Sequence, residues 1–353
     1  MSTRDRKPTR SFRSKAPPVL SGHGACSEEA SLLILPPRLL DLVLYRVEGK
    51  NAARASCTQI RDSVFRVMTS LKFWANRERP PLFHQASQVS SLPTAAVLTR
   101  CAGRLQTLEC SDTVISDLSP LSALTALQTL DCSGTNVSDL GPLSALKGLQ
   151  SLDFRKTEVV DLSPLATLTE LTDIDCFCTG VWDLGPLGAL TKMEDLSLRI
   201  CQVGDLAPLA RLTALCDLDI MGTNVSDLLH LSAMKNLQVL DCSDTQVSDL
   251  SPLAGLVALQ ILNCSCTEVS DLSPLAALTE LKELDINETD VSDLSALAGL
   301  TELRVLDCSQ TAVSDLMPLS RMFNLQQLNC QYTDVSDLSP VSMLGDLDLM
   351  SDP

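Results

Sequence analysis

The residues of this 353-residue chain best suited to chemistry are its 14 cysteines, because a thiolate can attack an electrophile, bind a metal or form a disulfide. Seven of them recur at one position of an internal repeat: Cys110, Cys132, Cys176, Cys242, Cys264, Cys308 and Cys330. A metal site needs ligands that converge on one point, and thiols in a straight column do not converge. We therefore expect these thiols to fill a hydrophobic core, with a metal or redox role as the alternative.

Other residue types that commonly carry catalysis are sparse. The three histidines are His23, His84 and His230, and none is spaced to pair with a Cys or Ser nucleophile. The sequence Gly22-His23-Gly24 lacks the Lys-Ser or Lys-Thr pair that follows a phosphate-binding loop. We predict that the protein is not an enzyme and holds no cofactor and no metal.

Charge divides the chain into two parts. Residues 1–104 hold 17 Lys and Arg against 7 Asp and Glu, whereas residues 105–353 hold 10 against 37. A surface as acidic as the second part repels the phosphates of nucleic acid and of anionic membranes. This excludes nucleic acid as a partner of the second part and favours a positively charged or amphipathic protein surface.

Targeting signals and membrane spans are judged from the N-terminal region. The first residues are polar and rich in Arg, unlike a secretory signal peptide. The most apolar stretch, 32–47, contains Pro36, Pro37, Arg38 and Asp41, so we predict no membrane span. We expect an intracellular, cytoplasmic protein, and nuclear or host-cell delivery through the basic tail stays open.

An internal repeat dominates the second part. The dipeptide Asp-Leu occurs eleven times, each copy 22 residues after the last. Its Asp residues are Asp117, Asp139, Asp161, Asp183, Asp205, Asp227, Asp249, Asp271, Asp293, Asp315 and Asp337. Such regular self-similarity indicates a solenoid, in which each unit buries its apolar residues only by stacking on its neighbours.

Each unit contains two different spacings of apolar residues. Leu130 and Cys132 alternate with polar residues, which predicts a short strand with one inward face. Leu140, Leu143 and Leu146 follow at intervals of three, which predicts a helical or 3₁₀ turn. The Ser-Pro pair before many of these turns predicts a capping hydroxyl and then a Pro at the first helical position.

The 22-residue unit with its Asp-Leu-Ser-Pro-Leu motif resembles the internalin-type leucine-rich repeat, and the resemblance covers 105–346. It implies an α/β fold, a right-handed solenoid with parallel strands on the concave face and short helical or 3₁₀ turns on the convex face. The chain departs from the family where Asn is usual, since ten copies carry Thr and one carries Cys201. Because a hydroxyl makes fewer hydrogen bonds than an amide, we expect weaker bonding between neighbouring turns.

Two columns of outward-facing strand residues are candidates for a binding surface. One column is acidic in eight of eleven copies, which indicates either solubility or a basic partner. In the other, four adjacent copies replace small polar residues with large ones of the types that dominate interface energies. With two deviating neighbours they form the predicted partner site on the concave face: Arg155, Lys156, Phe177, Trp182, Arg199 and Met221. Random drift of a decaying repeat is the alternative.

The first hundred residues lack the repeat. We predict a disordered basic tail over 1–30, a small helical domain over 31–76 and a linker or N-terminal cap over 77–104. Eleven repeats then occupy 105–346, and a truncated repeat ends the chain at 347–353.

The segments 35–44 and 53–62 together resemble the F-box motif. The resemblance implies that the helical domain docks on an adaptor of a cullin ubiquitin ligase. The implied adaptor contacts are Leu35, Pro36, Leu39, Leu40 and Leu44. A plain helical domain that covers the first repeat is the alternative.

These observations predict a non-enzymatic protein that binds other proteins, in the form of an F-box and leucine-rich-repeat receptor that recruits a target to a ubiquitin ligase. The alternative is an internalin-like or regulatory-subunit binding module without a ubiquitin link.

Overall fold

The computed structural model describes residues 32–33, 70–72, 103–345 and 347–351. Its strands form one parallel sheet of 14 strands, hydrogen-bonded in the order of the sequence. The strands are β1 (Leu32–Leu33), β2 (Ser70–Lys72), β3 (Thr107–Glu109), β4 (Thr129–Asp131), β5 (Ser151–Asp153), β6 (Asp173–Asp175), β7 (Asp195–Ser197), β8 (Asp217–Asp219), β9 (Val239–Asp241), β10 (Ile261–Asn263), β11 (Glu283–Asp285), β12 (Val305–Asp307), β13 (Gln327–Asn329) and β14 (Asp348–Met350). Leu130 lies opposite Leu152, so the 22-residue period of the sequence is the register of the sheet.

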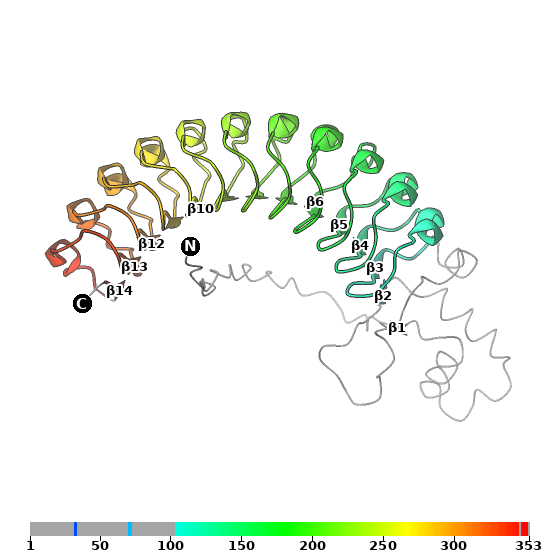
Figure 1. Ribbon diagram of the computed structural model, residues 1–353, viewed down its shortest axis with the longest axis horizontal. Coiled ribbons are helices and arrows are strands. Elements are labelled where there is room, and N and C mark those ends of the chain that lie inside the picture. The colour runs from blue at the N-terminus through cyan, green and yellow to red at the C-terminus, as the bar shows by residue number, and fades with distance from the viewer. Residues whose placement is uncertain (1–31, 34–69, 73–102, 346, 352–353) are drawn as a thin grey trace, which may run out of the picture. The chain divides into compact units, whose positions relative to one another are not determined.

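A short 3₁₀ helix follows each strand from β3 to β13, as the spacing of three predicted. These helices are η3 (Ser119–Ala123), η4 (Gly141–Ala145), η5 (Ser163–Leu165), η6 (Gly185–Ala189), η7 (Ala207–Arg211), η8 (Leu229–Leu231), η9 (Ser251–Leu253), η10 (Ser273–Ala277), η11 (Ser295–Gly299), η12 (Met317–Leu319) and η13 (Ser339–Val341). The strands line the inner curve of an arc and the 3₁₀ helices form its outer curve (Figure 1). The predicted leucine-rich-repeat solenoid is confirmed.

The predicted capping role of the Ser-Pro serines is wrong. Ser119 is already the first residue of η3, and its backbone N–H donates to Oδ1 of Asp117 at 2.8 Å. Asp161 accepts the backbone N–H of Ser163 in the same way, and a second bond comes from the Ser163 hydroxyl. The first N–H groups of a helix have no partner inside it, so the aspartate of each Asp-Leu motif supplies one. These hydrogen bonds lower the pKa of Asp161.

One continuous core runs through the solenoid between the strands and the 3₁₀ helices. Its members are the repeating Leu and Val residues together with the seven column cysteines. All seven thiols are buried, at no more than 2% exposure, which confirms that they fill the core. Burial raises the pKa of Cys110 to about 12, so this thiol stays protonated at neutral pH.

The repeated threonines bond within their own turn, and Thr179 alone among them in the described residues also contacts the neighbouring turn, at 3.4 Å from the Cys201 sulfur. Thr135 Oγ1 donates to the backbone oxygen of Cys132, and Thr289 Oγ1 donates to that of Ile286, both at 2.6 Å. The hydroxyl closes the turn that follows the strand, which is a local role that a shorter side chain than Asn can perform. Hydrogen bonds between turns come from the backbone of the parallel sheet instead.

Two described strands lie within the segment predicted to be helical. Leu71 of β2 pairs with Leu108 of β3, and Leu32 of β1 pairs with Leu71. These two short segments therefore extend the sheet beyond the first repeat, because the free edge of β3 offers unpaired backbone groups. The predicted helices, and all five proposed adaptor contacts from Leu35 to Leu44, lie outside the described residues.

Candidate protein-binding face

Three columns of side chains point out of the concave face. From β3 to β13 the middle strand residue is buried, and the two flanking ones are at least partly exposed, as in β4, except that Asp307 of β12 is buried. We name the column before the buried residue the outer column: Thr107, Thr129, Ser151, Asp173, Asp195, Asp217, Val239, Ile261, Glu283, Val305 and Gln327. The column after it is the carboxylate column: Glu109, Asp131, Asp153, Asp175, Ser197, Asp219, Asp241, Asn263, Asp285, Asp307 and Asn329. Two residues further is the variable column: Ser111, Ser133, Arg155, Phe177, Arg199, Met221, Ser243, Ser265, Asn287, Ser309 and Gln331.

The carboxylate column has a structural role that the sequence interpretation did not include. Asp131 Oδ1 accepts the backbone N–H of Ser133 at 2.9 Å, and Asp219 Oδ1 accepts that of Met221 at 2.9 Å. Asn263 makes the same bond to Ser265, at 3.0 Å. The oxygen at this position therefore holds the turn after the strand, whether it belongs to a carboxylate or an amide.

The variable column differs sharply between repeats. Ser133, Ser243 and Ser309 are buried, and their hydroxyls donate to the aspartate of the same turn. In the four repeats from β5 to β8 the column carries Arg, Phe, Arg and Met instead. These side chains are too long to fold back into the turn, so they cover the concave surface.

Phe177 is the centre of this group. Lys156 Nζ lies 5.6 Å from the centroid of the Phe177 ring, and the guanidinium carbon of Arg199 lies 5.8 Å from it. Both distances are within the range of cation–π attraction. Arg155 contacts two carboxylates of the carboxylate column, Asp153 and Asp175, at 3.3 Å each. We call Arg155, Lys156, Phe177, Arg199 and Met221 the central patch.

The position after the variable column has a left-handed backbone. Gly134 and Gly222 adopt it with φ of 63° and 66°, where a glycine has no steric cost. Lys156 and Ile200 adopt it with φ of 54°, which is unfavourable for a residue with a Cβ and most of all for a β-branched one. Asp244 and Glu288 in later repeats adopt the same conformation, with φ of 53° and 55°, so this backbone cost is shared along the solenoid.

Comparison with known proteins places this architecture in a family. The family model described as Leucine Rich repeats (2 copies) matches residues 104–146 and 235–277. A crystal structure of internalin C2 from Listeria monocytogenes is 32% identical, with a TM-score of 0.51, over 52% of this chain and 83% of that one. The chain belongs to the leucine-rich-repeat family. None of the curated proteins matches it in sequence.

Other solved leucine-rich-repeat proteins share the fold at lower identity. The internalin InlF of Listeria monocytogenes is 24% identical, with a TM-score of 0.73, over 89% of this chain and 94% of that one. The plant peptide hormone receptor RGFR1, solved in complex with RGF2, is 17% identical, with a TM-score of 0.66, over 82% of this chain and 49% of that one. These similarities establish the solenoid architecture.

The outer column of this leucine-rich-repeat protein holds a feature that sequence reasoning missed. Asp173, Asp195 and Asp217 occupy three adjacent strands beside the central patch, where other repeats carry Thr, Ser, Val, Ile, Glu or Gln. Burial and then the charge of Asp195 and Asp241 raise the pKa of Asp217 to about 6. Alignment of the repeats on this column would have revealed the run, which we call the acidic strip.

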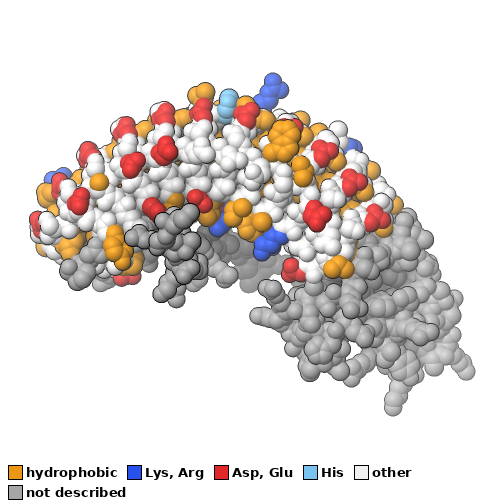
Figure 2. Space-filling model, in the orientation of Figure 1, with side chains coloured by type: hydrophobic (Ala, Val, Ile, Leu, Met, Phe, Trp, Pro, Cys, Tyr) orange, Lys and Arg blue, Asp and Glu red, His pale blue; other side chains and the backbone are white. Residues whose placement is uncertain are grey.

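Carboxylates of the carboxylate column beside the central patch also have raised pKa values. Burial raises the pKa of Asp153 to about 7 and that of Asp219 to about 6, although Arg155 and Arg199 respectively oppose the shift. Figure 2 shows basic and apolar side chains gathered at the inner rim of the arc among acidic ones. The central patch is therefore a cationic and aromatic island in an acidic surface.

Trp182 is not part of this island. It lies between β6 and η6, in the segment that joins the concave face to the convex face, and is 62% exposed. It lines a hollow of about 200 Å³ with Val160, Leu162 and Pro186. Small-molecule sites usually have at least about 300 Å³, so this hollow is an apolar surface feature and not a ligand pocket.

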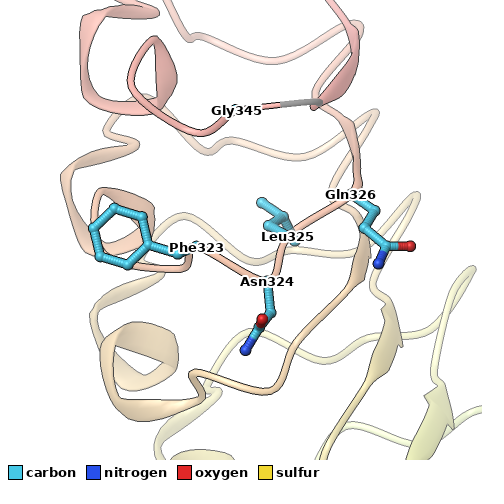
Figure 3. A pocket seen from close by; sticks show the side chains of 5 residues that line it. All are labelled: Phe323, Asn324, Leu325, Gln326 and Gly345. Carbon is cyan, nitrogen blue, oxygen red and sulfur yellow. The ribbon is translucent and has the colours of Figure 1, made fainter.

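A second exposed apolar group lies near the C-terminal end of the leucine-rich repeats. Phe323, Tyr332 and Met343 are 75%, 72% and 81% exposed. Phe323 and Gln326 point in opposite directions at the edge of a shallow hollow whose far side is Gly345 (Figure 3). Because their side chains do not converge, the hollow has no geometry for a small ligand.

Neither a metal centre nor a membrane-spanning helix is found in the part of the chain that the structure describes. No group of three or more His, Cys, Asp and Glu residues there has the arrangement of a metal site. No helix among the described residues is long and apolar enough to cross a membrane.

Proposed function

We propose that this leucine-rich-repeat protein is a non-enzymatic binding module that recognises a basic protein through the central patch and the acidic strip. The observation that carries the proposal is the clustering of the Arg, Phe and Met side chains of the variable column in four adjacent repeats. At about 4.8 Å between strands, these repeats span about 14 Å, close to the width of a helix with its side chains.

The contacts of the central patch support a hydrogen-bonding role for its cations. Arg199 Nε is buried and makes no hydrogen bond within the protein, while the guanidinium lies against Phe177. An unsatisfied buried donor is unfavourable, so a partner that draws the guanidinium out of this position and supplies an acceptor gains binding energy there. Arg and aromatic residues are also the types most often found at the centre of protein interfaces.

The acidic strip supports the choice of a basic protein over nucleic acid. Asp195 faces Asp173 and Asp217 across the parallel ladder, and the pKa of Asp195 is raised by burial and by its neighbour Asp173. A lysine or arginine of a partner would relieve this repulsion, whereas a phosphate would increase it. The preferred partner surface is thus basic, with an acceptor group at its centre that meets Arg199.

A triple variant tests this proposal. Arg155→Glu and Arg199→Glu together with Phe177→Ala should abolish capture of the partner by the full chain. The matched control reverses Arg211 and Arg321 and truncates Phe323, all exposed and outside the concave columns. Circular dichroism confirms that both variants fold. Retention of the partner by the triple variant would place the interface elsewhere.

The ubiquitin-ligase role is a narrower form of the same proposal. It depends on the F-box-like sequence of residues 31–76, and its contacts Leu35, Pro36, Leu39, Leu40 and Leu44 lie outside the described residues. The internalin neighbours support a binding module without a ubiquitin link. Co-purification of a cullin-ligase adaptor with the full chain, lost on Leu39→Asp with Leu40→Asp, would support the role, and its absence from the wild-type sample would eliminate it.

The cytoplasmic location also remains a proposal, and it agrees with the reduced state of the core thiols. All cysteines among the described residues are free. Such thiols persist in reducing compartments and are rare in oxidising ones. Immunofluorescence of the full chain with an epitope tag tests the cytoplasmic location. The same experiment with residues 1–30 deleted tests whether the basic tail is a targeting signal.

A further inference from the structure

Cys201 stands apart from the cysteines that fill the core. It occupies the position at which the ten other repeats carry a threonine that closes its own turn. Thr179, for example, donates to the backbone oxygen of Cys176 at 2.8 Å. The Cys201 thiol instead reaches back to the preceding repeat, where it donates to the same oxygen of Cys176 at 3.1 Å.

This orientation brings two thiols together. The sulfur atoms of Cys201 and Cys176 lie 3.9 Å apart, and both residues are buried. The Cys176 thiol also donates along the sheet to the backbone oxygen of Ser197 at 3.0 Å, as Cys242 does to that of Asn263 at 3.4 Å, so it is the orientation of Cys201 that distinguishes this pair. A disulfide has a sulfur–sulfur distance of about 2.0 Å, so closure of the Cys176 and Cys201 pair requires an approach of about 2 Å.

We propose that Cys176 and Cys201 are a redox-active dithiol, which closes to a reversible disulfide between two neighbouring repeats when the protein meets hydrogen peroxide. The Cys201 thiolate attacks one oxygen of the peroxide, which yields a sulfenic acid and, with a proton, one water. The Cys176 sulfur then attacks the sulfenic sulfur. Hydroxide leaves, takes the Cys176 proton and becomes the second water, so the two thiols lose two electrons and the peroxide gains them.

The local environment favours Cys201 as the attacking group. Hydrogen bonding with the Cys176 thiol and with Thr179 lowers the pKa of Cys201 to about 7, against the effect of burial. Burial raises the pKa of the column thiol Cys264 beyond the neutral range. Because the thiolate is the reactive form of cysteine, Cys201 reacts before the column thiols.

The disulfide would lie directly beneath the central patch. Cys176 precedes Phe177 in the chain, and Cys201 follows Arg199 by two residues. Approach of the two sulfurs breaks the bond from Cys201 to the Cys176 backbone and moves the two turns that carry these side chains. If the central patch is the partner site proposed above, on which this step rests, oxidation changes partner affinity.

Peptide mapping of the full chain tests the dithiol without any partner. A Cys178→Ser background removes the exposed thiol two residues from Cys176. The protein is treated with hydrogen peroxide, alkylated under denaturing conditions and digested with trypsin, which separates residues 157–192 from 200–211. We expect these two peptides to be linked, and the link to disappear after a reductant or in a Cys201→Thr variant, which restores the threonine of the repeat.

The second readout is stability towards denaturant. The disulfide closes a loop between residues 25 apart, so oxidation should raise the unfolding midpoint, reversibly, and leave that of Cys201→Thr unchanged. Met343, which is 81% exposed, reports the peroxide dose through its sulfoxide. Oxidised Met343 with unlinked peptides would overturn the dithiol. That result leaves the partner-site proposal intact, and loss of that proposal leaves the cross-link intact.

Discussion

The repeats from β5 to β8 and those from β9 to β12 have the same backbone and opposite surfaces. In both groups the strand centre is buried and the carboxylate-column oxygen holds the following turn, as Asp219 and Asp241 do. In the later group the variable column carries Ser243, Ser265, Asn287 and Ser309, which bond to neighbouring protein groups. In the earlier group it carries the large side chains of the central patch.

This difference separates the residues that fold the solenoid from the residues that form its binding surface. The earlier group has an unfavourable feature that the later group avoids, namely the three adjacent carboxylates of the acidic strip. The later group shows that this feature is not needed for folding. Features that lower stability and are not required by the fold are expected at binding sites.

The largest losses of stability should be similar in the two groups of repeats, because they come from substitutions in the shared core. Leu218→Ala in β8 and Leu262→Ala in β10 each remove a fully buried side chain from the same position of the repeat. We expect each to lower the free energy of unfolding by about 2–5 kcal/mol, from lost burial and the cavity that remains. Denaturant unfolding followed by circular dichroism measures both. A loss confined to one variant would contradict a common core.

Loss of the threonine hydroxyl should also have equal effects in both groups, at a smaller size. Thr157 and Thr245 are buried and donate to the backbone oxygens of Phe154 and Cys242. Thr→Val at either position keeps the shape and removes the donor, which should cost about 1–2 kcal/mol. Thermal unfolding of the two variants is the measurement, and Thr301→Val, exposed on the convex side, is the control.

The acidic strip should distinguish the groups by pH. The folded-state pKa of Asp217, about 6, is above its unfolded value, so the native state binds more protons between these values. Stability from this group is therefore present at low pH and is lost as pH rises through about 6. Asp217→Asn should raise stability at pH 8 by on the order of 1 kcal/mol and leave it unchanged at pH 4.

The strip variant needs a control from a repeat outside the acidic strip. Thr129→Asn places the same amide in the outer column at a repeat without adjacent carboxylates, and should show no such pH dependence. Unfolding midpoints in urea at pH 4 and pH 8 provide the comparison. Equal behaviour of the two variants would show that the strip is not under electrostatic stress.

The smallest change in stability is expected where the surfaces differ most. Met221→Ser converts the patch residue of β8 to the residue of β9, whose hydroxyl bonds to the aspartate of its own turn. We expect a change of about 0.5 kcal/mol or less, since the turn already exists in both groups. The measured partner affinity should fall while the unfolding midpoint stays constant. A large loss of stability would mean that Met221 is part of the fold.

Much of this architecture was predictable, because one period governs it. The 22-residue repeat of Asp117 and its equivalents gives the register of the sheet, and the alternation around Leu130 gives the inward face. Column membership alone placed Cys132 in the core. The repeat similarly located the central patch, since a deviation from a period is visible in the sequence. The F-box-like segment has no such period, and only its flanking strands β1 and β2 are described.

Side-chain partners were beyond the reach of the sequence. Nothing in the order of residues indicates that Asp161, and not Ser163, caps the 3₁₀ helix, because both are polar and adjacent to the same N–H groups. The separation of Trp182 from Phe177 depends on how the chain turns from the concave face to the convex one.

The sequence by itself determined a solenoid, its register, its core and the repeats that depart from the common pattern. The repeat period determines which residues point inward and which point outward, and this alternation is the same in every copy, independent of side-chain conformation. The tertiary structure alone decided which atoms meet between copies: the cations on Phe177 and the thiols of Cys176 and Cys201. These contacts depend on side-chain rotamers and turn geometry in two repeats at once, and no linear pattern contains that information.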